Sequence, residues 1–573
     1  MIGLHEARLL GHLAKWRMTW DHVDLDEQPP PGLGPRFVSP RAAAALIPDG
    51  AVCVSTGIAG HQRPSAVLYA LRDRYRAQAH PAGLTWCAVG AQGGRGKIPG
   101  TVEELGLPGL ITRLIVGHTE TFRAQMRLAD EGRLEVHALP QGEFAFLIEG
   151  QARDELERVS ETGVGTYLDP RCGTGSAVTP GADSLVTEAT LEGRPALRYT
   201  LPRLQVALFG APYADRDGNL YVHDAVCLTE MHAAAEAVHH HGGLVIACVG
   251  DVIEPGPQHR PYIPGEWVGA IVVNRHQEQT ITVPQRHPWA MFTPGAHVDE
   301  HQALADLTFL NDLMRVSPHR TPADAATARL AAALIVRHVS RGAHVNVGVG
   351  LPEEVAKHLY EAGISADLVQ STESGCYGGV PTSGAFFGGA INPQRHESSA
   401  WVFRSYAQSL DLSCLGALEV DSEGNVNVSN RGDRPSDFVG PGGFLDIARF
   451  ARTLVFCTTF ATGATSHIAQ GRMLVDKPGT SKFVDRVRQV TFAAPAALAR
   501  GQRVFYVSDV GAFRLTADGL ELALVFPGID IERDILARSG ARIVVTSGEV
   551  PVVSQDILTG EGFRLTWEER PLV

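Results

Sequence analysis

Short apolar runs alternate with glycine-containing loops and with stretches of helical period along most of the chain. From Gly50, the apolar run AVCVS is followed by the loop TGIAGHQRP and then by SAVLYALRDRYRA, whose apolar residues recur at helical spacing. The same order returns after Gly342, where AHVNVGVG precedes LPEEVAKHLYEAG. Strands that alternate with helices predict an α/β fold with open, mostly parallel sheets, in which ligands bind beyond the carboxyl ends of the strands.

A second internal repeat has more identical residues than the first. The segment 210–222, GAPYADRDGNLYV, agrees with the segment 416–428, GALEVDSEGNVNV, at six of 13 positions without a gap. The shared DxxGN piece is typical of a turn between two strands, because Gly and Asn tolerate positive φ. Each copy precedes a helical stretch and then an apolar run, GGLVIACV in the first half and RTLVFCTTF in the second. Two repeats in the same order predict two related α/β domains in one chain.

Stretches rich in proline and polar residues give the expected domain boundaries. Residues 1–36 form an N-terminal extension, in which a short helical pattern runs into the stop PPPGLGP. We expect the first domain at 37–290 and the second domain at 326–573. The intervening linker, 291–325, is rich in proline and polar residues.

Composition and charge narrow the class of protein. Apolar residues make up 44% and charged residues 20% of the 573 residues, which is ordinary for a globular protein. The net charge of −13 argues against a nucleic-acid partner, and no apolar run is long enough for a membrane helix. The N-terminus lacks a secretory pattern, so we expect a cytoplasmic enzyme whose cysteines are buried free thiols, the eight being Cys53, Cys87, Cys172, Cys227, Cys248, Cys376, Cys414 and Cys457.

The stretch 366–393 carries the strongest candidate for chemistry. Glu373 follows the apolar Leu368-Val369 and is the only acid between Asp367 and Glu397. Six glycines follow it closely, and such a loop lets a ligand approach the backbone: Gly375, Gly378, Gly379, Gly384, Gly388 and Gly389. The plainer interpretation is a glutamate that caps or fixes a turn.

Two further loops are candidates for binding an oxyanion. GPGGF at 440–444 opens a helix, where backbone N–H groups are unpaired. LPQG at 139–142 places Gln141 after a proline, as a held donor or as a simple turn residue. HExxH and GxSxG are absent, and consecutive His239, His240 and His241 should point in different directions as a surface cluster. We therefore expect no metal and no redox cofactor.

The motif TESGCYGGVP resembles the Glu-x-Gly-x-x-Gly signature of the family I coenzyme A transferases, which include single-chain acetate and propionate CoA-transferases and 3-oxoacid CoA-transferases. The elements LPQG, GxGTxxDPR, GGLVIA, LGAxExDxxGNVNVS and GPGGFxDI occur in the family's order over roughly residues 40 to 530. The resemblance implies two similar open α/β domains of the CoA-transferase type, joined in one chain.

The resemblance also implies roles for particular residues. Glu373 matches the catalytic glutamate that attacks an acyl-CoA thioester. Gln141, through its side chain, and Gly443, through its backbone N–H, match the oxyanion hole. Glycines of the two motifs match positions that contact coenzyme A, namely Gly375, Gly440, Gly442 and Gly443. The loop TGIAGHQRP departs from the family's commoner Gly-Phe-Gly form, which leaves the choice of acyl chain open.

The implied reaction is transfer of CoA between short-chain acids, as in fatty-acid and ketone-body metabolism, through a mixed anhydride and a glutamyl-CoA thioester. Its partners would be acyl-CoA and small carboxylic acids, with CoA as a co-substrate rather than a bound cofactor, in a homodimer or homotetramer. Alternatives are an acyl-CoA thioesterase, a carrier-protein transferase subunit of a lyase or decarboxylase, a sugar-phosphate isomerase and a non-catalytic CoA-binding module.

Overall fold

The first half of the chain builds an eight-stranded sheet, which the computed structural model shows within its described residues, 4–94, 98–317, 319–546, 548–568 and 572. Seven strands are parallel, and the short β9 (Leu220–Tyr221) pairs with β8 in the opposite direction. The order of the parallel strands is β11 (Ala270–Val273), β10 (Leu244–Val252), β8 (Val206–Ala214), β1 (Val52–Ser55), β2 (Leu84–Ala88), β3 (Ile111–Val116) and β4 (Glu135–Ala138).

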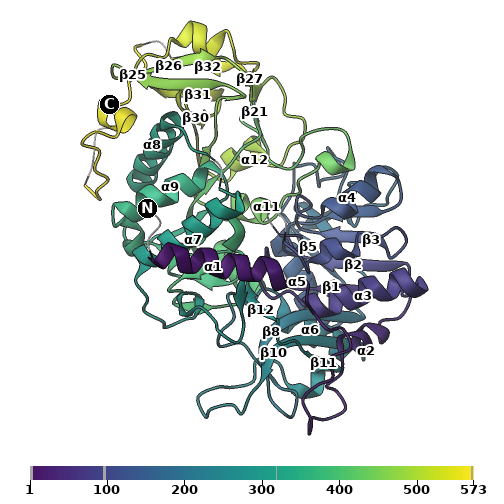
Figure 1. The fold of residues 1–573 in the computed structure, drawn as a ribbon. Helices are drawn as coiled ribbons and strands as arrows, with labels where there is room; N and C mark the ends of the chain where they lie inside the picture. The colour runs from purple at the N-terminus through teal and green to yellow at the C-terminus, as the bar shows by residue number, and fades with distance from the viewer. Residues whose placement is uncertain (1–3, 95–97, 318, 547, 569–571, 573) are drawn as a thin grey trace.

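The second half builds another eight-stranded sheet, so the predicted α/β class is confirmed (Figure 1). Its first five strands run parallel, and β30 and β31 continue the sheet as an antiparallel hairpin. The order is β15 (Val369–Gln370), β14 (His344–Val347), β20 (Leu410–Leu415), β23 (Thr453–Cys457), β29 (Arg503–Ser508), β30 (Gly511–Thr516), β31 (Gly519–Val525) and β32 (Ile543–Val544).

Five strands occupy equivalent places in the two sheets. The order β2-β1-β8-β10-β11 of the first half matches β15-β14-β20-β23-β29 of the second. The DxxGN turn of the first half follows β8, that of the second half follows β21 (Glu419–Asp421), and the two turns make the same hydrogen bonds. The Oδ1 atom of Asp215 accepts from Asn219 N at 2.9 Å, and that of Asp421 accepts from Asn425 N at 2.9 Å. The sequence repeats therefore correspond to a repeated structural unit.

Helices flank both sheets where the apolar period predicted them. The helical stretch after the first loop forms α3 (Ser65–Gln78), and the one after the second forms α9 (Leu351–Glu361), with Pro352 in its first turn. The other main helices are α2 (Pro40–Ala45), α4 (Arg123–Asp130), α5 (Gln141–Gln151), α6 (Met231–His240), α8 (Pro322–His338), α10 (Ser399–Ser409), α11 (Phe444–Phe450), α12 (Ala494–Ala499) and α13 (Gln555–Thr559).

Smaller antiparallel sheets extend each half. In the first half, β7 (Arg194–Thr200) lies between β5 (Glu157–Ser160) and β6 (Val186–Leu191). In the second half, β25 (Thr465–Ala469) pairs with β26 (Arg472–Lys477) at the end of the molecule that also holds the chain's C-terminal residues (Figure 1).

The N-terminal extension contains α1 (Leu4–Thr19), which packs on α7 (Glu300–Met314) and lies across the junction of the two halves (Figure 1). Its Leu9, Leu13 and Trp16 are buried in a cluster that also holds Phe386 of the glycine-rich loop. The indole N–H of Trp16 donates to the carboxylate of Glu278 at 2.5 Å. The expected linker, residues 291–325, therefore contains the fifteen-residue helix α7. The domain boundaries predicted from the sequence remain our proposal.

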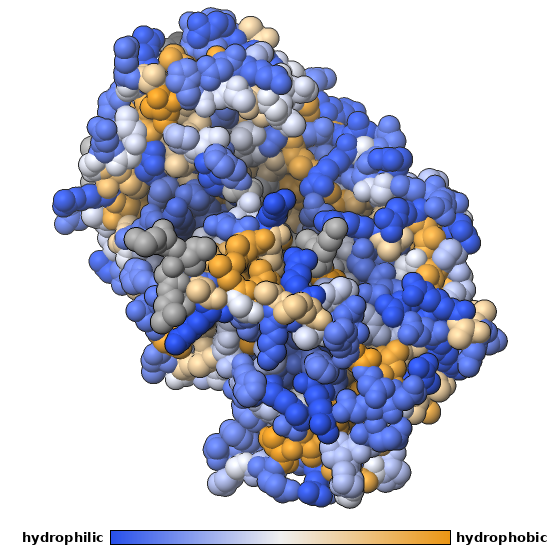
Figure 2. Space-filling model, viewed as in Figure 1, coloured by the Kyte–Doolittle hydropathy of each residue, from blue (hydrophilic) through white to orange (hydrophobic). Residues whose placement is uncertain are grey.

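Burial follows the sequence prediction for most cysteines. Seven of the eight free cysteines are buried, whereas Cys172 is exposed because it lies in the loop 163–175 rather than in an apolar strand. The face of the molecule in Figure 2 is predominantly hydrophilic, with small, separate apolar patches. Among the described residues, no helix combines the length and apolar character that crossing a membrane requires.

Candidate active site

Glu373 lies three residues beyond the carboxyl end of β15, at the edge of the second sheet where the fold class predicts a ligand. The loop that carries it is held from both sides. Glu397 N donates to Gly375 O at 2.8 Å, and Thr229 N, from the first half, donates to Ser374 O at 3.0 Å. Gly375 has a φ of +110°, and a Cβ there would lie 1.9 Å from Glu397 O. Only glycine fits, so this loop has a fixed shape.

The carboxyl group of Glu373 is half-buried and forms part of the wall of a cavity of about 790 Å³. Within the described chain, no cation pairs with it, and burial raises its pKa to about 7. Residues of α7, β14, α9 and the glycine-rich loop form much of the remaining wall, among them Leu304, Asn346, Tyr360 and Phe387. A cavity of this size accommodates a ligand larger than acetate.

A polar network lies behind Glu373. The Oγ of Ser371 is 2.7 Å from His344 Nε2, and the amide of Asn346 donates to the Tyr406 hydroxyl at 3.2 Å. Burial raises the pKa of Tyr406, and the nearby carboxylate of Glu373 raises it further. The sequence prediction missed this network because its members come from three separate segments of the second half.

The GPGGF loop contacts Glu373 directly. Gly443 is the N-cap of α11, and a Cβ added there would meet Glu373 Cγ at 3.0 Å and the ring of Phe403 at 3.1 Å. Within the described part of the chain, the Gly443 N–H donates no hydrogen bond. An unpaired N–H beside the Glu373 carboxylate matches the donor that the sequence resemblance places in an oxyanion hole.

Gln141 reaches the same loop from the first half of the chain. It is the first residue of α5, and its backbone N–H donates to Gly442 O at 3.0 Å. Its side-chain amide is buried and donates to Val89 O at 3.1 Å. The amide carries two N–H groups, so one is left for a ligand. The structure thus brings Gln141, Gly443 and Glu373 together at the contact between the two halves.

Asp446 fixes this contact and was missed as a site residue, although it stands in the motif GPGGFLDI. Its Oδ2 accepts a hydrogen bond from Gly142 N at 2.9 Å, which ties the start of α5 to α11. Asp446 is fully buried, and burial together with the neighbouring Glu143 raises its pKa well above the usual range. The motif residue Asp446 could have been singled out from the sequence. Its partner could not, because Gly142 lies 304 residues away in the chain.

The four glycines expected at the coenzyme A site have different surroundings. Gly440 and Gly442 lie against His118, and Gly375 lies against the backbone of Glu397. None of these glycines, nor Gly443, is among the residues that line the 790 Å³ cavity. A role in CoA binding for these four residues therefore remains a proposal from the sequence resemblance.

The divergent loop TGIAGHQRP packs against the glycine-rich loop. A Cβ on Gly388 would lie 2.7 Å from Ile58 Cγ2, and His61 Nε2 lies 3.1 Å from Phe387 O. Burial lowers the pKa of His61 to about 4, so its imidazole is neutral at pH 7. The place where this chain departs from the family pattern is therefore next to the candidate nucleophile.

The histidine triplet does not lie at this site. We expected its side chains to point in different directions, yet His240 and His241 both approach Asp154. Arg203 donates a hydrogen bond to His241 Nδ1 at 3.3 Å. That nitrogen is therefore occupied by a guanidinium group and is not free to bind a metal ion. This exposed cluster is accounted for by ion pairing.

Known proteins resemble this chain over most of its length. No family model matches it. The caffeate CoA-transferase of Acetobacterium woodii is 29% identical over 516 residues, covering 87% of this chain and 93% of that protein. The acetate CoA-transferase YdiF of Escherichia coli K12 is 28% identical over 518 residues, covering 88% and 92%.

Solved structures agree with the sequence comparison. The apoenzyme of the acyl-CoA transferase YdiF from E. coli O157:H7 superposes with a TM-score of 0.80 at 25% identity, covering 93% of this chain and 98% of that one. Its thioester complex with CoA superposes equally well, with a TM-score of 0.80. The shared fold, the motifs in their order and the similarity along nearly the whole chain lead to one conclusion: this chain is a CoA-transferase enzyme similar to the caffeate and acetate CoA-transferases.

Proposed function

We propose that this enzyme transfers CoA between an acyl-CoA and a free carboxylic acid in two half-reactions, with Glu373 as the nucleophile. The observation that carries the proposal is the contact between Glu373 and the Gly443 turn, with Gln141 bound to that turn from the first half. One nucleophile and two hydrogen-bond donors, contributed by both halves, are the minimum that acyl transfer through an oxyanion requires.

The first half-reaction would proceed in two steps. The Glu373 carboxylate attacks the thioester carbonyl, the C–S bond breaks, and an acyl-glutamyl anhydride and CoA thiolate form. The thiolate then attacks the glutamyl carbonyl, which releases the original acid and leaves a glutamyl-CoA thioester. A second acid reverses these steps and departs as its CoA ester. Each attack places negative charge on a carbonyl oxygen, where the Gly443 N–H and the Gln141 amide would stabilise it.

The environment of Glu373 suits this route. A carboxylate whose pKa lies near 7 is a stronger nucleophile than an ordinary glutamate, and about half of it is ionised at pH 7. An anhydride hydrolyses readily, so the half-buried position of Glu373 at the seam between the two halves is an advantage. CoA also binds through its remote nucleotide, and that binding energy can orient the thioester.

Steady-state kinetics with two substrates test the proposal. The names of the relatives point to caffeate and acetate, so the panel of acids should contain aromatic and short-chain members. We expect parallel double-reciprocal lines, because the first acid leaves before the second binds. Hydrolysis of acyl-CoA in the absence of an acceptor acid would indicate a thioesterase. Intersecting double-reciprocal lines would contradict a glutamyl-CoA intermediate.

Transfer should depend on pH through Glu373. The carboxylate attacks and the protonated acid does not, so kcat/KM for acyl-CoA should fall about tenfold per pH unit below 7 and level off above it. Binding of desulfo-CoA over the same pH range controls for the phosphates of CoA. A profile that is flat between pH 5.5 and 8, after that correction, would rule out a nucleophile with this pKa.

Replacing Gln141 by alanine should slow transfer by about 10²-fold, because one oxyanion donor is lost. The KM for acyl-CoA should change little, since the donor acts mainly in the transition state. Gln151→Ala is the matched control: Gln151 lies at the other end of α5 and donates to Pro202 O at 2.9 Å. If both variants lose activity equally, the effect of Gln141 is structural and it is no oxyanion donor.

A further inference from the structure

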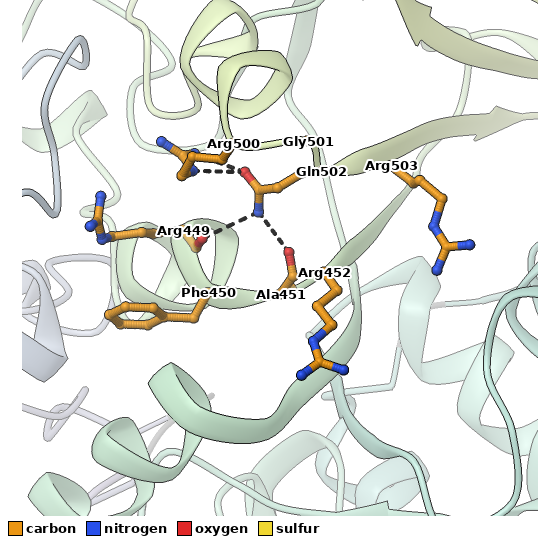
Figure 3. Close-up of a pocket in the computed structure, with 8 residues that line it drawn as sticks. All are labelled: Arg449, Phe450, Ala451, Arg452, Arg500, Gly501, Gln502 and Arg503. Carbon is orange, nitrogen blue, oxygen red and sulfur yellow. Dashed lines mark hydrogen bonds between the residues drawn. The ribbon is translucent and has the colours of Figure 1, made fainter.

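A second cavity, of about 560 Å³, lies at the amino ends of two central strands of the second sheet, β23 and β29; Figure 3 shows the residues that line it. Half of the residues that line it are arginines, and the set is Arg449, Phe450, Ala451, Arg452, Arg500, Gly501, Gln502 and Arg503. We call the four arginines the arginine cluster. A cluster of cations on a chain with a net charge of −13 is not explained by the overall composition.

The cavity is separate from the candidate active site. Arg452 precedes β23 and Arg503 begins β29, and these parallel strands pair with Thr453 opposite Arg503. The cavity therefore lies at the amino ends of strands whose carboxyl ends point toward the Glu373 side. Helix α11 separates the two places: it begins after Gly443 and has Arg449 in its last turn, roughly 10 Å along the helix axis.

Positive charge exceeds negative charge in this cavity. Arg449 pairs with Glu161, and Arg452 pairs with Asp411 at 3.1 Å. Arg500 donates to the neutral amide of Gln502 at 2.8 Å. For Arg503, no carboxylate partner exists among the described residues. Glu161 also lies close enough to act on Arg500, but it already pairs with Arg449 and Arg194, so guanidinium groups outnumber carboxylates here.

The backbone beneath the arginine cluster is fixed. The side-chain amide of Gln502 donates to three carbonyls at the end of α11, those of Ala448 at 2.9 Å, Arg449 at 3.2 Å and Ala451 at 2.6 Å. Arg503 N donates to Arg452 O at 3.1 Å. Figure 3 shows Arg449 and Arg500 extending to one side of Gln502, and Arg452 and Arg503 to the other. A rigid floor with long cationic side chains on both sides is suited to an anion.

We propose that the arginine cluster binds a small phosphate-bearing ligand that carries at least two negative charges. Guanidinium groups pair with phosphate oxygens through two parallel hydrogen bonds, which makes arginine the preferred residue for this recognition. The volume exceeds that of a single phosphate and lies within the range of small-ligand sites. Phe450 adds an aromatic side chain to the wall. The diphosphate group is the shared chemistry, and its source is either a free polyphosphate or a nucleotide.

Calorimetric titration of the whole enzyme, saturated with CoA and at constant ionic strength, tests this proposal. Saturation with CoA blocks the diphosphate-binding part of the active site. Pyrophosphate, ADP and AMP are the probes. We expect saturable binding of pyrophosphate and ADP that CoA does not prevent. Tighter binding of ADP than of pyrophosphate identifies a nucleotide, whereas equal binding identifies the diphosphate alone.

The double variant Arg500→Gln/Arg503→Gln should weaken this binding by about tenfold or more, since two charge-assisted contacts are lost. Its KM for acyl-CoA should stay unchanged. The control Arg76→Gln/Arg472→Gln removes the same charge from two exposed arginines elsewhere and should bind normally. No saturable binding at millimolar pyrophosphate or ADP overturns the proposal, as does binding that CoA abolishes or that both double variants weaken equally. These outcomes do not depend on the proposed role of Glu373.

Discussion

Glu373→Gln should abolish CoA transfer, with a loss on the order of 10⁴-fold or more, because an amide cannot form the anhydride or the thioester. The side chain takes part in no ion pair of the described chain, and the shape of its loop depends on Gly375 and on backbone hydrogen bonds. The fold should therefore survive. Transfer assays with both Glu373→Gln and Glu373→Ala check this result, and activity near that of the unmodified enzyme in either would exclude Glu373 as the nucleophile.

Thermal unfolding distinguishes loss of chemistry from loss of structure. The folded-state pKa of Glu373, about 7, lies above the value of 4.5 expected without burial, so the folded form binds the proton more tightly. The charged carboxylate therefore lowers stability increasingly as pH rises from about 4.5 to 7. Glu373→Gln should unfold at a higher temperature than the unmodified enzyme at pH 8 and show a smaller difference at pH 5. Glu397→Gln, which removes the partner of Arg395, is the control that should retain activity.

Gly443→Val should reduce the rate by about 10³-fold, the upper end of the cost of losing one oxyanion donor, because it disturbs the donor and the nucleophile together. Even a single Cβ at this position would press on Glu373 Cγ at 3.0 Å and on Phe403 at 3.1 Å, and valine adds two methyl groups. The turn or Glu373 must move, and a displacement of about 1 Å costs roughly 10² in rate.

Single-turnover measurements of acyl-CoA consumption show whether the chemical step is affected. Gly34→Val is the matched control, because Gly34 has no atom within 4 Å of its Cβ position. We expect that variant to behave normally. If Gly443→Val kept its single-turnover rate, the GPGGF turn would be too far from the reacting carbonyl to supply a donor.

Much of the fold follows from local patterns. The DxxGN turns form because Asp, Gly and Asn make the same hydrogen bonds wherever a strand must reverse, so their repetition revealed the two related halves. The position of Glu373 after an apolar strand, and of Gly443 at the start of a helix, also follows from strand–loop–helix order. That these two residues touch could be inferred only from the family resemblance.

Contacts between distant segments could not be predicted from the sequence. The hydrogen bond from Gly142 to Asp446 depends on how the two halves dock. The hydrogen bond from the Gln141 amide to Val89 O joins two segments of the first half that lie 52 residues apart. Proline and polar residues at the ends of 291–325 predict a linker and do not reveal α7 within it. That helix is positioned by Leu307 and Leu310, which share a buried cluster with α1 and the glycine-rich loop. The position of α1 depends on the same cluster, in which its Leu9, Leu13 and Trp16 are buried.

The central claim is a covalent bond between Glu373 and CoA, and chemical trapping tests it most directly. Borohydride reduces a thioester to an alcohol but leaves a carboxylate unchanged. The enzyme should be mixed with acyl-CoA alone, reduced, digested and analysed by mass spectrometry. We predict inactivation together with conversion of the Glu373 carboxyl to a primary alcohol, and protection by excess acceptor acid, which discharges CoA. Retention of activity with an unmodified Glu373 peptide, under conditions where acyl-CoA is bound, would contradict the account.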